Sequence, residues 1–222
     1  MLVRGLIAVA CGCLFAVSGC ALYDNEQKPK IIYSPPVAET KPQIQEPKAA
    51  EIRSTQKVSL ETVPRDWIPA AGVEKDWTAI IIHHSATDSG NAAIFDEWHR
   101  EGKNWNGVGY DFVIGNGTNS ADGEVEVTYR WHEQTTGAHC GGTPGNWANK
   151  DGIGICLVGD FTKEEPTQRQ MQTLVRLVRF LQKRYGISAE RIYGHHTTPG
   201  ARVTDCPGRR FPMGRFKSML SG

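Results

Sequence analysis

The feature that most constrains the fold is a run of three isoleucines, residues 80–82, that leads directly into His83 and His84. Consecutive β-branched aliphatic residues predict a strand that is buried on both faces. A second strand-like stretch, residues 191–196, again ends in two histidines, and Cys206 follows it. An isolated pair is most simply explained by one core histidine and one surface histidine. Because the pattern occurs twice, it instead indicates a rigid sheet that presents imidazoles at its edge.

Two histidines and one cysteine form a three-ligand zinc set that leaves a coordination position for water. Successive side chains of a strand point to opposite faces, so one imidazole of each pair can face such a site. Periodicity leaves open which one does so. Zinc in this setting acidifies its water and polarises a carbonyl, which predicts hydrolysis of an amide or an ester. The spacing matches neither a zinc finger nor the His-Glu-x-x-His helix.

The charge balance excludes one class of function. The 222 residues include 25 Lys and Arg against 24 Asp and Glu. A nucleic-acid-binding protein would usually show a basic excess or a basic stripe, so we expect no nucleic-acid partner.

Three of the six cysteines lie in the first twenty residues, and Cys140, Cys156 and Cys206 belong to the body of the chain. An odd number leaves at least one of them unpaired or available as a metal ligand, and Cys206 is the candidate ligand. A disulfide between Cys140 and Cys156 is compatible with an oxidising compartment.

Residues 1–19 have the character of an export signal, with Arg4 before an apolar run that is too short to span a membrane comfortably. The run ends in Ser18, Gly19 and Cys20, which resembles the lipobox of bacterial lipoproteins. The resemblance implies cleavage before Cys20 and lipidation of its thiol. Ala21 after the cysteine fits sorting to the outer membrane, facing the periplasm. The alternative is an ordinary signal peptide that contains a cysteine.

Residues 20–61 form a proline-rich polar segment with few large apolar side chains, which predicts a flexible linker. Such a segment would let an anchored domain reach away from its membrane by roughly 35 Å as a coil. The folded domain is expected to occupy residues 62–222.

Within that domain, alternating and continuous apolar stretches predict strands, and residues with a period near 3.6 predict helices. Residues 167–185 show the clearest helix, with a capping box formed by Thr167 and Gln170, and its apolar face predicts core packing rather than a partner surface. Turn signals after residue 114 predict an antiparallel hairpin. Together these elements predict a single α/β domain with a central mixed β-sheet flanked by helices. The expected strands are 78–84, 109–114, 124–131, 152–161 and 192–196, and the expected helices are 91–101, 167–185 and 211–220.

Five motifs follow one another along the chain, at residues 82–87, 107–112, 137–139, 153–159 and 194–196 together with 204–208. In this order they resemble the zinc-dependent N-acetylmuramoyl-L-alanine amidases, a family that includes phage lysozyme-type amidases and peptidoglycan recognition proteins. The resemblance extends from about residue 78 to residue 207.

The resemblance implies roles for individual residues. His83, His195 and Cys206 match the zinc ligands. Tyr110 matches a tyrosine that helps to handle the attacking water or the oxyanion, although a strand tyrosine that caps the core would look the same. His139 matches an active-site histidine that is not usually a ligand.

Two further positions differ among members of the family. Thr204 falls where some members carry lysine and others threonine, so it is the candidate neutral donor to the oxyanion. Cys156 falls where certain relatives have a glutamate that could serve as general base.

The implied function is hydrolysis, by zinc-activated water, of the amide bond between the lactyl group of N-acetylmuramic acid and L-alanine of the stem peptide. The expected partners are peptidoglycan or muropeptides, together with a membrane reached through the lipid anchor, and the expected form is a monomer. Two alternatives belong to other classes: a non-catalytic peptidoglycan-binding protein and a wall-tethering lipoprotein. The presence of Cys206 favours the enzyme.

Overall fold

The computed structural model describes residues 63–70, 72 and 74–221, all within a compact unit that begins at residue 57. The expected export signal (1–19), the lipidated Cys20 and the linker (20–61) lie outside the described residues. Within the described part of the chain, no helix has both the length and the apolar character that crossing a bilayer requires.

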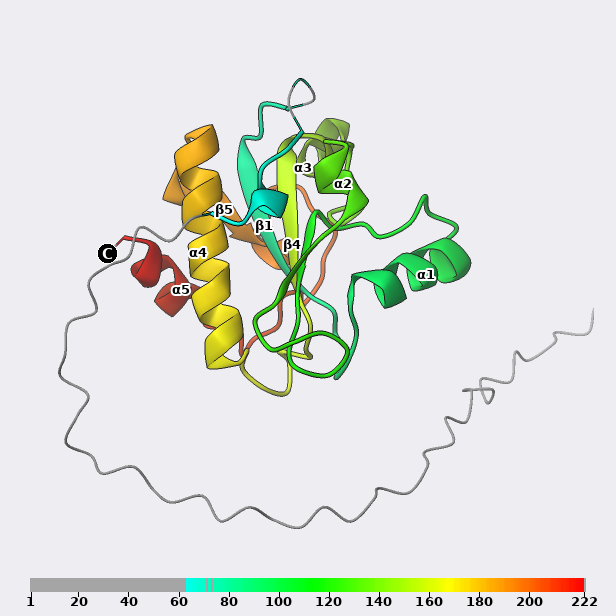
Figure 1. Cartoon of the computed structure of the whole chain (residues 1–222), viewed down its shortest axis with the longest axis vertical. Coiled ribbons are helices and arrows are strands. Elements are labelled where there is room, and N and C mark those ends of the chain that lie inside the picture. The colour runs from blue at the N-terminus through cyan, green and yellow to red at the C-terminus, as the bar shows by residue number, and fades with distance from the viewer. Residues whose placement is uncertain (1–62, 71, 73, 222) are drawn as a thin grey trace, which may run out of the picture. The chain divides into compact units, whose positions relative to one another are not determined.

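One five-stranded sheet organises the unit (Figure 1). Its strand order is β3-β2-β4-β1-β5. The strands β2, β4, β1 and β5 run parallel to one another, whereas β3 runs antiparallel to β2. This confirms the mixed sheet and the antiparallel hairpin. The strands are β1 (Ala79–His84), β2 (Phe112–Ile114), β3 (Val125–Val127), β4 (Gly152–Leu157) and β5 (Ile192–Gly194).

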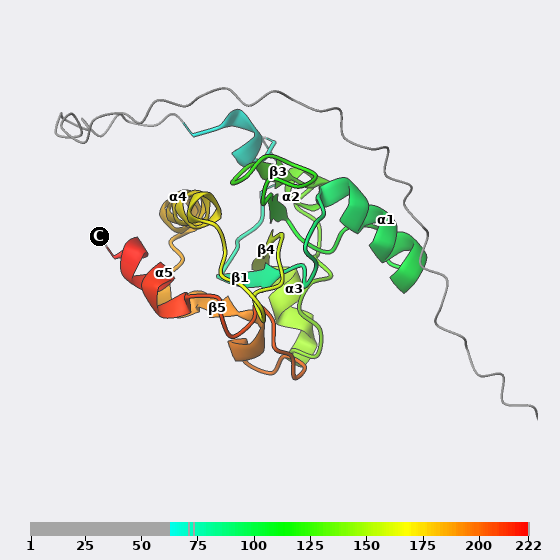
Figure 2. The ribbon, with the colours of Figure 1, turned by 90° about the horizontal axis from the view of Figure 1, so that it is seen from below.

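Helices cover both faces of the sheet, with α4 and α5 on one side and α1 and α3 on the other (Figure 2). Ile80 and Ile82 of β1 pack in the large core under α4, while Ala79 and Ile81 pack with Ala148 of α3 on the opposite face. The helices are α1 (Ala92–Lys103), α2 (Tyr129–His132), α3 (Trp147–Asp151), α4 (Gln168–Tyr185) and α5 (Met213–Leu220), with short 3-10 turns η1 (Arg65–Trp67), η2 (Pro144–Asn146), η3 (Ala189–Arg191) and η4 (His195–Thr197).

The ends of α4 follow from the sequence. The Thr167 hydroxyl accepts a hydrogen bond from the Gln170 amide at 3.0 Å, and the Gln170 side-chain oxygen accepts one from the Thr167 amide at 3.1 Å. Gly186 ends the helix in the left-handed conformation, with φ +66°. Leu174, Val178 and their neighbours on that face are buried against the sheet, which confirms core packing.

Several predicted boundaries were wrong for local reasons. The strand expected at 124–131 stops at Val127, because Thr128 caps a helical turn by accepting a hydrogen bond from the Arg130 amide at 3.2 Å. The strand expected at 152–161 ends before Gly159, whose φ of +148° departs from strand geometry. The strand expected at 192–196 ends at Gly194, so the second histidine pair lies in η4.

The Cys140–Cys156 disulfide does not form, because both cysteines are free and buried in different places. Cys140 packs with Ala79 and Ile81, whereas Cys156 packs with Phe95 and Val113. Each thiol therefore serves as a small apolar group in its own cluster.

The capping box gives a first prediction. Thr167→Ala should lower the free energy of unfolding by about 1 kcal/mol, because the Gln170 amide loses its acceptor. Thr167→Ser, which keeps the hydroxyl, should stay close to wild type. Urea unfolding followed by circular dichroism measures both variants, and equal stability of the two would contradict the role given to the cap.

Asp111 gives a pH-dependent prediction. Burial raises the pKa of Asp111 to about 7, and its Oδ2 accepts a hydrogen bond from the Gly154 amide at 2.8 Å. The folded state therefore holds a proton that the unfolded state, with a carboxyl pKa near 4, releases. This group's contribution to stability should decrease as the pH rises from about 4 to about 7.

Asp111→Asn should remove that slope, measured as the free energy of unfolding in urea at several pH values. Parallel pH profiles of wild type and variant would contradict the assignment.

Candidate metal centre

Three potential metal ligands converge beyond the carboxyl ends of two neighbouring strands. His83 is the penultimate residue of the strand β1, His195 follows β5, and Cys206 lies in the loop after η4. One ligand atom from each lies within 4.8 Å of the other two. Nδ1 of His83 is 3.6 Å from Sγ of Cys206, and the ring centroids of His83 and His195 are 4.7 Å apart. The structure therefore brings together the three residues that the sequence analysis selected as ligands.

Strand pairing explains this convergence. Ile82 of β1 lies beside Gly194 of β5 in parallel register, so the residues that follow them, His83 and His195, emerge at the same edge of the sheet. The loop that carries Cys206 is tied back to η4 by a hydrogen bond from the His196 amide to the Cys206 carbonyl at 2.8 Å. The His84 amide lies 3.4 Å from the Cys206 sulfur.

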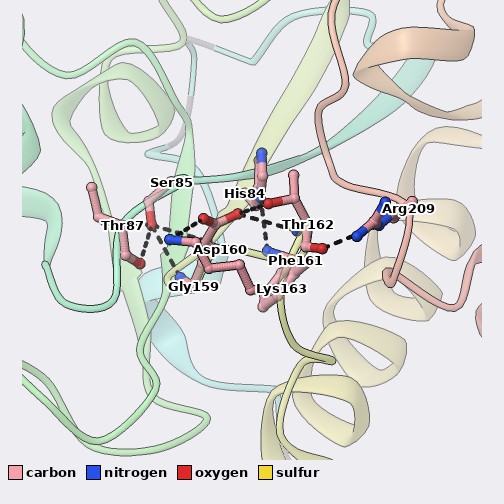
Figure 3. Close-up of polar contacts among 9 residues, drawn as sticks. All are labelled: His84, Ser85, Thr87, Gly159, Asp160, Phe161, Thr162, Lys163 and Arg209. Atoms are coloured by element: carbon pink, nitrogen blue, oxygen red, sulfur yellow. Dashed lines mark hydrogen bonds and ion pairs between the residues drawn. The ribbon is translucent and has the colours of Figure 1, made fainter.

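His84 points away from the ligands, to the side of the sheet covered by α4, as strand alternation predicts. Its Nδ1 accepts a hydrogen bond from the Phe161 amide at 3.1 Å (Figure 3). Burial lowers the pKa of His84, although Asp160 and Asp205 act in the opposite direction.

His196, the second residue of the other pair, is exposed, and its Nδ1 lies 3.0 Å from the Cys206 carbonyl. Alternation does not explain the orientation of this pair, because both histidines lie in a 3-10 turn.

Polar contacts fix the segment that follows β1 against the loop that follows β4 (Figure 3). The Ser85 hydroxyl accepts a hydrogen bond from the Gly159 amide at 3.0 Å, and Thr87 donates to the same hydroxyl at 2.8 Å. In the adjoining loop, Asp160 accepts from the Thr162 hydroxyl at 2.6 Å and pairs with Lys163 at 2.8 Å. These contacts hold the end of β1, and so the backbone of His83, in one position.

The donor atoms are neutral in their buried setting. Burial lowers the pKa of His83 well below its usual range and also lowers the pKa of His195. Burial raises the pKa of the Cys206 thiol to about 12. Neutral imidazoles keep a lone pair for a metal, and a bound cation would bring the thiol pKa down.

One observation shows that the donor set fits a metal. Nε2 of His195 is buried and has no hydrogen-bond partner among the described residues. A buried polar atom without a partner lowers the stability of the fold. A cation held between His83, His195 and Cys206 would supply a partner for the unpaired imidazole nitrogen. Among the residues that the structure describes, this is the one group of three His, Cys, Asp or Glu side chains arranged to hold a metal.

Tyr110 lies beside the ligands, with its ring centroid 5.3 Å from that of His83. The Cys156 thiol is its neighbour, and burial raises the pKa of the Tyr110 hydroxyl well above the usual range. Cys156 is the register partner of His83 on β4, and burial raises the pKa of its thiol as well. Both groups are therefore neutral, and Cys156 is unsuited to act as a general base.

His139 contacts His83 on the side away from Cys206. Its Nδ1 is 3.1 Å from Nε2 of His83, and its Nε2 is 3.3 Å from the Gly152 carbonyl oxygen. Burial lowers its pKa to about 3.

Thr204 stands at the rim of the centre and lines two adjoining cavities. The first, of about 490 Å³, is also lined by Trp105, His195 and Arg202. The second, of about 630 Å³, is also lined by His196, Asp205 and Arg209. The Thr204 hydroxyl accepts a hydrogen bond from the Cys206 amide at 3.2 Å, so its own proton is available to a ligand.

Two residues near the centre were missed by the sequence analysis. The Asn149 side-chain oxygen accepts hydrogen bonds from the amides of His139 and Cys140, both at 2.8 Å, and so shapes the loop that carries His139. The Trp105 ring packs against His99 in a tilted arrangement, with the two centroids 4.8 Å apart, and forms one wall of the first cavity. Trp105 lies two positions before the first residue of the 107–112 motif, but nothing in the sequence shows that a short helix, α3, returns Asn149 to the site.

Comparison with known proteins agrees with this geometry. Residues 74–209 match the family described as N-acetylmuramoyl-L-alanine amidase. A human N-acetylmuramoyl-L-alanine amidase is 30% identical over 120 residues, covering 53% of this chain and 18% of the human protein. Peptidoglycan-recognition protein LB of Drosophila melanogaster is 29% identical over 141 residues, covering 59% of this chain and 54% of that protein. In both cases the match covers less than two thirds of the relative.

A solved structure has the same fold over most of its length. The N-acetylmuramoyl-L-alanine amidase LysC from Clostridium intestinale superimposes with a TM-score of 0.56 and 29% identity, covering 66% of this chain and 86% of LysC. The family match spans more than half of the chain and includes the whole histidine–cysteine centre. The chain therefore belongs to the N-acetylmuramoyl-L-alanine amidase family, as the five motifs predicted.

Proposed function

We propose that this chain is a zinc-dependent peptidoglycan hydrolase that cleaves the amide bond between the lactyl group of N-acetylmuramic acid and L-alanine of the stem peptide. The observation that carries the proposal is the convergence of two neutral imidazoles and one thiol within 4.8 Å. Two nitrogen donors and one sulfur donor suit zinc, and three protein ligands leave a position for water or substrate. When bound, zinc would supply the positive charge that acidifies a water molecule and polarises the scissile carbonyl.

Tyr110 would donate a hydrogen bond to the substrate. Its raised pKa keeps the hydroxyl protonated, and its neighbour, the Cys156 thiol, is a weak hydrogen-bonding group that would not compete with a substrate oxygen. A hydrogen-bond donor that faces developing negative charge in a partly dry site can lower the activation free energy by several kcal/mol.

Thr204 is the second candidate donor. Because its hydroxyl accepts from the Cys206 amide, the hydroxyl proton can be donated to another acceptor, and the two cavities beside it are the places where that acceptor would lie. A substrate with a sugar on one side of the amide and a peptide on the other needs such a pair of adjoining spaces. Thr204 would then act as a neutral oxyanion donor at the junction.

The cellular setting is part of the proposal. Lipidation at Cys20 and the 20–61 linker would hold the 62–222 domain at the outer membrane, facing the periplasm, within reach of peptidoglycan or shed muropeptides. The domain would act there as a monomer.

The activity can be tested on the purified full chain with peptidoglycan as substrate. Mass spectrometry of the products should show free stem peptides that begin with L-alanine. A chelator should stop release, and added zinc should restore it. Cys206→Ala should lower the rate of release by more than about 100-fold, because it removes a ligand of a metal that stabilises the transition state by several kcal/mol.

Two results would contradict the proposal. Unaltered release by Cys206→Ala would exclude the metal assignment. Tight binding of peptidoglycan without any cleavage would favour the non-catalytic binding protein.

The two histidines of β1 should respond differently to substitution. His83→Ala should lose zinc and activity, because it removes a ligand. His84→Ala should keep zinc but lose about 1–3 kcal/mol of stability, because the Phe161 amide loses its acceptor. Metal content measured by atomic absorption, together with urea unfolding, separates the two effects. Equal loss of zinc in two folded variants would show that strand alternation does not divide their roles.

A further inference from the structure

A line of hydrogen-bonding atoms leads from the candidate metal centre into the sheet. Sγ of Cys206 lies 3.6 Å from Nδ1 of His83. Nε2 of His83 lies 3.1 Å from Nδ1 of His139, and Nε2 of His139 lies 3.3 Å from the carbonyl oxygen of Gly152. Each imidazole thus has both of its nitrogens facing a defined neighbour.

The carbonyl at the end of this line sets the direction of every hydrogen bond in it. A carbonyl oxygen can only accept, so Nε2 of His139 must carry the proton. In a neutral ring, Nδ1 of His139 is then the acceptor, and Nε2 of His83 must donate to it. This leaves Nδ1 of His83 as a lone pair that faces Cys206, which is the form that binds a metal.

The His139 ring cannot turn away from this arrangement. It lies in a slot between two glycines: a Cβ built on Gly154 would lie 2.5 Å from its Cδ2, and one built on Gly137 would lie 2.6 Å from the same atom. Its backbone amide is held by the Asn149 side chain at 2.8 Å. The ring contacts found among the described residues are with imidazoles and a carbonyl, and none is with an acid that would favour a charged ring.

We propose that His139 is a positioning residue that selects the Nε2-protonated tautomer of His83 and so directs the lone pair of Nδ1 into the metal centre. The inference rests on the metal site proposed above, and it replaces the catalytic role expected for His139. Because both nitrogens of His139 are already engaged, neither is free to exchange a proton with the substrate.

The first test is zinc affinity, measured on the purified full chain by competition with a chromophoric chelator. His139→Leu removes the acceptor and should weaken zinc binding by about 10–100-fold, the usual effect of losing such a partner of a ligand. His139→Asn places an amide oxygen near the position of Nδ1 and should stay close to wild type. His132→Leu, which removes an exposed imidazole on α2, is the matched control and should bind as wild type does.

The second test is the tautomer itself, read from the ring nitrogen shifts in ¹⁵N NMR of the metal-free wild-type chain. His83 and His139 should both be protonated at Nε2. This measurement needs no variant, so it remains decisive if His139→Leu fails to fold.

The outcomes separate this inference from the proposed function. A wild-type chain that binds no zinc would refute the metal site. A chain that binds zinc, but shows His83 protonated at Nδ1 or equal affinity in His139→Leu and wild type, would refute only the role of His139.

Discussion

The parallel pairing of β1 between β4 and β5 is the constraint on which the rest of the structure depends. It buries both faces of β1, so the isoleucines of one face pack under α4 and the other face is left to Ala79, Ile81 and His83. Parallel strands bring their carboxyl ends to one edge, where loops can gather functional groups. His83 therefore combines a rigid backbone with a side chain at the open end of the sheet.

The chemistry of the centre follows from burial. Low polarity around His83, His195 and Cys206 keeps the imidazoles neutral and the thiol protonated. Burial makes the imidazoles weaker bases and the thiol a weaker acid, so such a set is poorly suited to acid–base catalysis on its own. It is well suited to a cation, which would be attracted by the lone pairs and would displace the thiol proton. The same burial makes Tyr110 a neutral hydrogen-bond donor rather than a base.

Glycine is used at the centre to make space for histidine. Gly137 and Gly154 form the slot in which the His139 ring lies, and any side chain at either position would occupy it. The 153–159 motif thus has a physical reason for its first glycine, separate from strand propensity. The slot connects the sheet to a metal ligand through side-chain hydrogen bonds, which extend the rigidity of β4 to His83.

The sequence was informative where local rules govern. The isoleucine run predicted β1, the Thr167 and Gln170 pair predicted the start of α4, and strand alternation separated His83 from His84. It was less informative where tertiary contacts decide. The 3-10 turn at His195 depends on the returning Cys206 loop, and the position of Asn149 depends on α3. The direction of the His83 and His139 hydrogen bond depends on the Gly152 carbonyl, which lies thirteen positions from His139 along the chain.

The claim that His83, His195 and Cys206 together hold zinc is the centre of this account. X-ray absorption at the zinc edge of the zinc-loaded full chain tests it most directly, because it reports which atoms surround the metal. The account predicts one sulfur at about 2.3 Å and two imidazole nitrogens at about 2.0–2.1 Å, with a lighter atom completing a four-coordinate shell. A shell of nitrogen and oxygen without sulfur, or one with six ligands, would contradict it.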